Sequence, residues 1–236
     1  MKIALINGSP KTKNSASGIL LEDLKKYLEK NAEVVNFELH LSEIPKEVIE
    51  ELKKIDTWVF AYPLYVDGIP GHLLSCLIQL EEVSIHKSDL HIYGIVNCGF
   101  YEGIHGKLAL QILENWCLKA GFIWGGGIGV GCGGALVGMP KTAAGHGPKA
   151  AIDKAVAKLS DIIIKGEIQK NNYVSLAFPR FLYKIVGQMR WRKLIKANGG
   201  KAKDLGKNIL SKTNGYFKQV SYQSLPLFRR TVKILF

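Results

Sequence analysis

The sequence predicts an α/β protein, with a parallel sheet covered by helices on both faces and a basic helical extension after it. Three observations predict this class. Short apolar segments alternate with amphipathic ones five times over residues 1–164, unusual loops follow the first, third and fourth apolar segments, and the charge balance changes near residue 164. Alternating strands and helices form parallel sheets, because each connecting helix packs back onto a face of the sheet.

The first strand, loop and helix indicate an anion site. Residues 2–7 form an apolar run that is typical of a buried parallel strand. Gly8 and Pro10 end it, hydroxyl-bearing residues follow, and a helical pattern covers 19–28. Backbone amides and the dipole at a helix N-terminus attract phosphate groups. The stretch alone leaves open two plainer explanations, a helix N-cap and an ordinary Gly-Ser-Pro turn.

The remaining elements follow from the same two periodicities. We expect strands over 33–39, 56–62, 90–97 and 122–128, and helices over 45–54, 72–82, 105–120 and 149–164. The segment 63–71 contains two prolines and two glycines, which predicts a loop. In a parallel sheet the carboxyl ends of the strands meet at one edge, where ligands bind. The loops after strands one, three and four therefore converge on one candidate site.

Several other kinds of site are excluded or weakly supported. The GxxxxGK[ST] phosphate loop is absent, and 129–134 matches GxGxxG in form only, because it lies after the last strand. The four cysteines are scattered without a CxxC pair, which argues against zinc, iron–sulfur and disulfide sites. We expect no signal peptide before the first strand, and no apolar run approaches the roughly 18 residues of a membrane span. We expect a cytoplasmic protein without a bound metal.

Three loop segments resemble one known family. They read GSPKTKNSAS over 8–17, YPLYVDGIP over 62–70 and NCGFYE over 97–102. Together they resemble the flavodoxin-like NAD(P)H-dependent FMN oxidoreductases, which include FMN reductases and quinone reductases, over about residues 1–164. The resemblance implies a flavodoxin-like three-layer sandwich with a five-stranded parallel sheet in the order 2-1-3-4-5. It also implies FMN as cofactor and NADPH or NADH as electron donor.

The resemblance assigns roles to three groups of residues. The residues expected to hold the FMN phosphate are Ser9, Lys11, Ser15, Ala16 and Ser17. Those expected beside the isoalloxazine are Pro63, Leu64, Tyr65 and Val66, and those expected at its other edge are Asn97, Gly99, Phe100 and Tyr101. A flavin needs flat apolar walls, so Tyr65 and Tyr101 are candidate walls, with core packing as the alternative. Hydride passes between nicotinamide and flavin, so no catalytic side chain is expected.

The expected function is an FMN-dependent oxidoreductase that passes reducing equivalents from NAD(P)H to a small acceptor. The acceptor classes left open are quinones, flavins, nitro or azo compounds and metal ions. The alternative is a non-enzymatic FMN electron carrier that docks a redox partner through its basic tail.

The charge distribution predicts a domain boundary between 1–165 and 166–236. Residues 1–164 carry 16 Lys and Arg against 18 Asp and Glu, whereas residues 165–236 carry 16 against two, giving −2 and +14. We expect one helix in the tail starting at 178–179, with an apolar stripe from Phe181 to Met189, and a second over 202–212. Three explanations of the tail stay open: docking on the body or on a second subunit of a homodimer, a membrane-surface helix, and nucleic-acid binding, which ranks last because no recognition motif is present.

Overall fold

The structure is a computed structural model that describes residues 1–83, 87–139 and 145–203. The chain divides into two compact units, Met1–Arg180 and Phe181–Phe236. The predicted helix over 202–212 lies almost entirely outside the described residues. No helix in the described part of the chain is both long and apolar enough to cross a membrane.

The first unit is built on a six-stranded parallel sheet in the order β2-β1-β3-β4-β5-β6. The strands are β1 (Lys2–Asn7), β2 (Glu33–Glu38), β3 (Thr57–Pro63), β4 (His91–Asn97), β5 (Ile123–Val130) and β6 (Asn172–Val174). The predicted order of five strands, 2-1-3-4-5, is confirmed, and β6 extends it by one strand. The chain therefore has the predicted three-layer α/β architecture.

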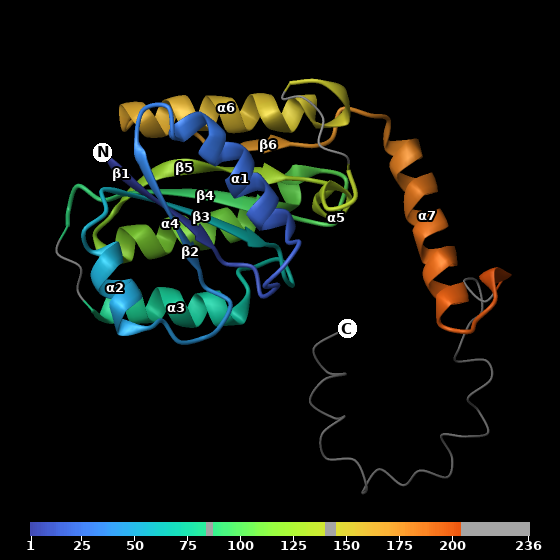
Figure 1. Ribbon diagram of the computed structural model, residues 1–236, viewed down its shortest axis with the longest axis horizontal. Coiled ribbons are helices and arrows are strands. Elements are labelled where there is room, and N and C mark those ends of the chain that lie inside the picture. Colours follow the sequence, from blue (N-terminus) through green and yellow to red (C-terminus); the bar gives the residue numbers. More distant parts are fainter. Residues whose placement is uncertain (84–86, 140–144, 204–236) are drawn as a thin grey trace, which may run out of the picture. The chain divides into compact units, whose positions relative to one another are not determined.

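Helices cover both faces of this sheet. Figure 1 shows α1 (Ala16–Leu28) and α6 (Ala150–Lys165) on one face, with α2 (Lys46–Leu52), α3 (Gly71–Glu82) and α4 (Lys107–Ala120) on the other. Three short helices lie in the connections: η1 (Gly103–Gly106), α5 (Gly133–Leu136) and η2 (Gly147–Lys149). The indole nitrogen of Trp116 in α4 donates to the Leu77 carbonyl of α3 at 2.9 Å, which fixes these two helices side by side.

The core between the sheet and α3 and α4 is rich in aromatic rings. The ring of Trp58 meets that of Phe122 at 5.9 Å between centroids, and Phe60 meets Trp116 at the same separation. Both pairs are edge-to-face, the arrangement that aromatic quadrupoles favour. Tyr62 is fully buried, and its hydroxyl donates to the Ala109 carbonyl at 2.9 Å, so burial leaves no polar group unpaired there.

Strand β6 comes from the stretch after residue 165, for which the sequence predicts only a helical extension. It pairs with the end of β5, where the glycine-rich run lies. A Cβ added at Gly129 would lie 2.7 Å from the Tyr173 ring and 2.4 Å from the Gly103 carbonyl oxygen. In the structure Gly129 therefore admits the Tyr173 ring of β6 and the Gly103 carbonyl of η1.

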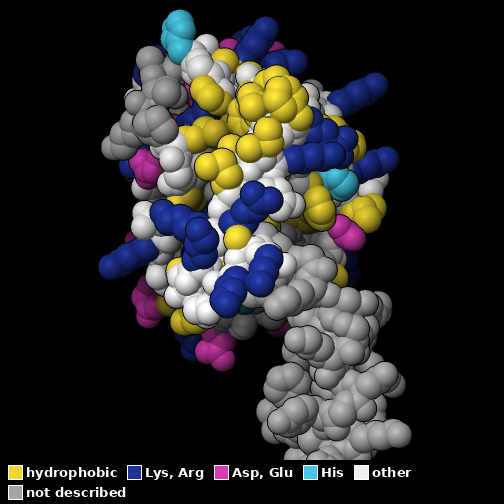
Figure 2. Space-filling model, turned by 90° about the vertical axis from the view of Figure 1, so that its right-hand side faces the viewer, with side chains coloured by type: hydrophobic (Ala, Val, Ile, Leu, Met, Phe, Trp, Pro, Cys, Tyr) yellow, Lys and Arg dark blue, Asp and Glu magenta, His cyan; other side chains and the backbone are white. Residues whose placement is uncertain are grey.

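The described part of the second unit is dominated by α7 (Arg180–Ala197). None of its residues is buried, and its exposed apolar side chains include Phe181, Val186, Met189 and Trp191. The predicted stripe occupies the first three turns, and Arg192, Lys193 and Lys196 follow it. The helix contains no acidic residue. On the face drawn in Figure 2, Lys and Arg side chains lie among hydrophobic ones, with few acidic side chains.

Candidate functional site

The loops that follow β1, β3 and β4 meet at the carboxyl edge of the sheet. Backbone hydrogen bonds continue the sheet ladder into them: Gly8 donates to the Ala61 carbonyl at 2.8 Å and Leu64 to the Asn97 carbonyl at 2.8 Å. Cys98 donates likewise to the Val130 carbonyl at 2.9 Å. The sequence prediction that these three loops share one edge is therefore met in the fold.

The loop before α1 is held in shape by its own polar side chains. Ser15 is the N-cap, and its Oγ accepts from the Gly18 amide at 3.0 Å. Asn7 Oδ1 accepts from the Ser9 amide at 3.1 Å, and Ser9 Oγ accepts from the Lys11 amide at 3.2 Å. These hydrogen bonds hold the loop in one shape, and the loop leads directly into a helix N-terminus that favours anions.

Asn97 joins the loops of three strands. Its side chain is 5% exposed, and its Nδ2 donates to Ser17 Oγ at 2.8 Å and to the Tyr62 carbonyl at 3.1 Å. Ser17 is only 1% exposed, so its hydroxyl faces Asn97 inside the protein. Both residues were predicted site residues, with separate roles at the phosphate and at the ring. In the structure they form one buried bridge beneath the loops.

The loop after β3 ends in a tight turn. Tyr65 and Gly68 exchange two backbone hydrogen bonds at 3.0 and 3.1 Å, with Val66 and Asp67 between them at φ of 49° and 58°. Positive φ is strained for a β-branched residue such as Val66. Tyr65 is 46% exposed and Val66 is 84% exposed. The turn therefore presents an aromatic ring and an apolar side chain at the edge of the site.

The loop after β4 presents one aromatic residue outward and uses the other internally. Phe100 is 55% exposed, and its ring lies 4.4 Å from that of His105 between centroids. The Tyr101 hydroxyl donates to the Phe178 carbonyl at 2.6 Å. Of the two tyrosines predicted as walls of the flavin site, Tyr65 is the more exposed to solvent. Tyr101 instead binds the segment that follows β6, through its hydrogen bond to Phe178.

The thiols near these loops are buried and protonated. Cys98 and Cys132 lie at the ends of β4 and β5, and burial raises the pKa of Cys98 and raises that of Cys132 to about 11. A thiol is a weak nucleophile when it keeps its proton. No group of three or more His, Cys, Asp or Glu in the described residues has the geometry to hold a metal ion.

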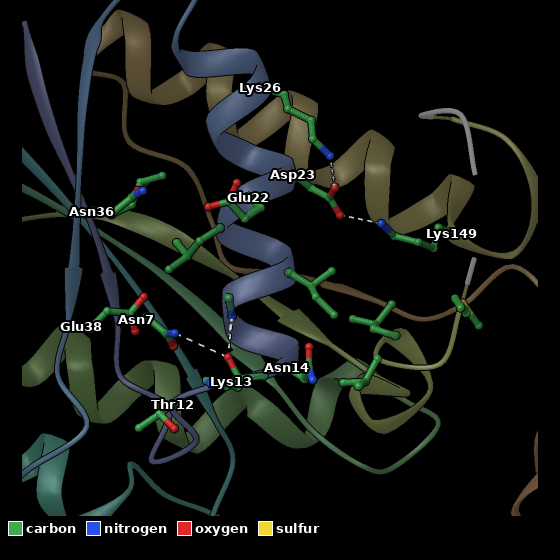
Figure 3. Close-up of a pocket in the computed structure, with 18 residues that line it drawn as sticks. Asn7, Thr12, Lys13, Asn14, Glu22, Asp23, Lys26, Asn36, Glu38 and Lys149 are labelled. Carbon is green, nitrogen blue, oxygen red and sulfur yellow. Dashed lines mark hydrogen bonds and ion pairs between the residues drawn. The ribbon is translucent and has the colours of Figure 1, made fainter. Parts of the chain in front are cut away.

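A cavity of about 590 Å³ adjoins the loop before α1 (Figure 3). Its lining comes from the loop, from α1, from β1 and β2, and from the segment around α5. Figure 3 shows Asn36 and Glu38 on β2 at one side of α1, and Asp23 between Lys26 and Lys149 at the other. Asp23 binds Lys26 at 2.8 Å and Lys149 at 2.5 Å, which ties α1 to the start of α6.

Three residues near the loop were not singled out from the sequence. Asn7 holds the Ser9 amide, His40 contacts the Ser9 carbonyl, and Glu38 contacts His40. Asn7 gives a usable signal, because a polar residue at the end of a buried strand needs a hydrogen-bond partner. His40 gives none, because its partner lies 31 positions earlier in the chain.

Comparison with known proteins gives structural likenesses only. No family model and no curated protein sequence matches the chain. A flavone reductase is 15% identical over 72% of this chain and 66% of its own, with a TM-score of 0.51. Rubredoxin oxygen:oxidoreductase from Desulfovibrio gigas is 12% identical over 70% of this chain and 35% of its own, with a TM-score of 0.52. An FMN-dependent NADH-azoreductase from Bacillus anthracis str. Ames Ancestor, in complex with FMN, is 12% identical. The match covers 69% of this chain and 99% of that one, with a TM-score of 0.48.

These identities show the fold and nothing finer. The strand order, the two helical layers and the two likenesses with TM-scores above 0.5 agree, and the fold is flavodoxin-like.

Proposed function

We propose that this protein binds FMN and passes reducing equivalents from NADPH or NADH to a small acceptor such as a quinone, a flavin or a nitro compound. The observation that carries the proposal is the meeting of three loops at one sheet edge, joined beneath by Asn97. Two proteins of similar fold bear the names flavone reductase and rubredoxin oxygen:oxidoreductase, which supports an oxidoreductase at a coarse level.

The residues present fit an FMN molecule. The loop from Ser9 to Ser15, which its own hydrogen bonds hold at a helix N-terminus, would bind the phosphate, with Lys11 adding charge. Tyr65 and Phe100 are the exposed aromatic residues that would flank the ring. Bound flavin supplies hydride and electron transfer, and the protein's part is to bind, orient and exclude water. Ser17 and Asn97 would act from below, by holding the loops in register.

The spectrum of the purified protein tests this proposal. We expect flavin absorbance, FMN on release, and bleaching on addition of NADPH or NADH. Bound FMN that neither NADPH nor NADH bleaches would favour the alternative, a non-enzymatic FMN carrier that docks a partner through the basic tail. Absence of flavin after reconstitution with excess FMN would contradict both.

The α7 helix is the observation that keeps the carrier alternative in view. It is basic throughout and its apolar side chains are exposed, so it is suited to binding another surface. We propose that this surface belongs to a second subunit of a homodimer, and that peripheral contact with an anionic membrane is the competing use.

We also propose a cytoplasmic location, in keeping with four cysteines that are all free thiols.

A further inference from the structure

We infer that His40 is a positioning residue for the phosphate loop: its ring holds the Ser9 carbonyl, and Glu38 holds the ring. The inference deepens the proposed function, because it rests on the loop being the phosphate site. His40 lies two residues beyond the end of β2, and neither β2 nor the segment after it contributes any of the predicted site residues.

Three contacts define the arrangement. His40 Nδ1 donates to the Ser9 carbonyl at 2.6 Å, and His40 Nε2 lies 3.0 Å from a Glu38 carboxylate oxygen. Ser9 is 3% exposed, and its amide is held by Asn7 on the other side. Both polar backbone groups of Ser9 are therefore fixed, one from β1 and one from beyond β2.

The Ser9 carbonyl is the right group to hold. The next residue is Pro10, which has no N–H, so the carbonyl is the only polar handle on that peptide. A carbonyl that turned toward a bound phosphate would repel it. By holding the oxygen toward His40, the ring keeps this negative end of the peptide dipole away from the anion.

Glu38 orients the ring and adds charge. A carboxylate behind an imidazole fixes its orientation, as in other carboxylate–histidine pairs. Both ring nitrogens have acceptor partners, so the two bonds exist together only when the His40–Glu38 pair carries one extra proton. Burial raises the pKa of Glu38, which favours retention of that proton. The other titratable groups facing the pair are His72 from α3, whose pKa burial lowers, and Glu22 from α1.

The test compares FMN dissociation constants of reconstituted variants. We expect His40→Ala to weaken FMN binding about tenfold, the equivalent of one lost hydrogen bond. His40→Asn should restore most of it, because its amide nitrogen can donate near the Nδ1 position, whereas His40→Gln should not. His91→Asn is the matched control: its Nδ1 also lies 3.0 Å from a carbonyl, that of Asp89, but at the opposite end of the sheet.

A pH series supplies a readout that a purely structural role would not move. The FMN phosphate itself titrates near pH 6, so wild type and His40→Asn are compared at each pH. The advantage of wild type should grow as pH falls from 8.5 to 5.5 and should vanish in Glu38→Gln. Wild-type affinity in His40→Ala, or an equal loss in all three His40 variants, would overturn the inference. If wild type binds no FMN, the proposed function fails, and the same variants are then tested with inorganic phosphate by amide shifts of Ser9 and Lys11.

Discussion

Individual side chains at the carboxyl edge of the sheet do two kinds of work, facing a ligand or holding the loops that face it. Ser15 and Ser17 hold the loop in different ways. Ser15, which is 6% exposed, caps α1, and Ser17 is buried against Asn97. Sequence reasoning identified both serines and the asparagine by type and position. It assigned no partners, because Ser17 and Asn97 are 80 positions apart and pair only through the sheet order.

Replacing both serines tests the phosphate loop. We expect Ser15→Ala with Ser17→Ala to weaken FMN binding by about 2–5 kcal/mol, through loss of loop shape and of groups that bond a charged ligand at roughly 1.5–3 kcal/mol each. Fluorescence titration of FMN measures this. Ser75→Ala is the control, because its hydroxyl only bonds the Gly71 carbonyl within α3. Unchanged affinity in a folded double variant would remove this loop from the site.

Asn97 is expected to contribute to both stability and flavin binding. Asn97→Ala leaves the Ser17 hydroxyl and the Tyr62 carbonyl buried without this partner. Each unsatisfied buried group costs roughly 1–3 kcal/mol, so we expect a loss of about 2–4 kcal/mol in the free energy of unfolding. Urea denaturation measures it. A loss below about 1 kcal/mol would mean that water takes over both bonds and that the bridge does not join the loops.

The buried thiols predict how stability responds to alkaline pH. Burial raises the pKa of Cys76 and of Cys132 to about 11, above the value of roughly 8.5 in an unfolded chain. A raised folded pKa means that the contribution to stability is complete below about pH 8.5 and is lost as pH rises toward 11. Native protein should resist iodoacetamide at pH 7.5 and react fully in guanidinium. Rapid labelling of the native thiols at pH 7.5 would contradict their burial.

Among the elements, β6 is the strand that the sequence pattern does not predict. Four of the five predicted strands, β1, β3, β4 and β5, are almost wholly buried, and their composition predicts it. Strand β6 is three residues of a polar, basic stretch, and it exists because Gly129 lets Tyr173 approach β5. Tyr93 supports the same region, since its hydroxyl donates to the Glu167 carbonyl at 2.8 Å. Such a short strand forms because of the strand it pairs with, and the sequence of the segment itself does not predict that pairing.

A glycine substitution tests this account of β6. We expect Gly129→Ala to destabilise the protein by about 1–3 kcal/mol, because the new methyl group would overlap the Gly103 carbonyl and the Tyr173 ring. Gly99→Ala is the control, since an added Cβ there meets nothing within 4 Å. Thermal unfolding of the two variants gives the comparison. Equal melting temperatures would show that β6 and η1 yield easily and do not depend on the glycine.

At the scale of the whole molecule, the charge boundary and the division into compact units fall at different places. The charge changes near residue 164, whereas the first compact unit extends to Arg180 and includes β6. Arg180 binds Glu102 at 2.8 Å and Tyr101 binds the Phe178 carbonyl, so the start of the basic stretch belongs to the body. The fold of the body was predictable because five strand–helix repeats carry it. The docking of 166–180 was not, because it rests on single contacts.

Deleting residues 181–236 separates the uses proposed for the tail. The remaining chain carries 19 Lys and Arg against 19 Asp and Glu, so its net charge falls from +12 to zero. The shortened chain keeps β6, the Arg180–Glu102 ion pair and the hydrogen bond from Tyr101 to Phe178, so we expect it to fold. If α7 packs on a second subunit, deletion should change the oligomeric state measured by light scattering, or lower solubility beyond that of a full-length charge-neutralised variant.

Two full-length variants identify which property of α7 matters. One replaces Lys184, Arg192, Lys193 and Lys196 with Gln, and the other replaces Phe181, Ile185 and Met189 with Ser. Docking on a subunit predicts that the second variant alone alters the oligomeric state, because burial of apolar area stabilises such contacts. Binding to anionic vesicles predicts that both variants lose vesicle affinity while the oligomeric state stays fixed, since lipid contact needs charge and apolar insertion together. A truncated protein with unchanged oligomeric state, solubility and FMN content excludes subunit docking, and the tail then serves a function separate from the flavin site.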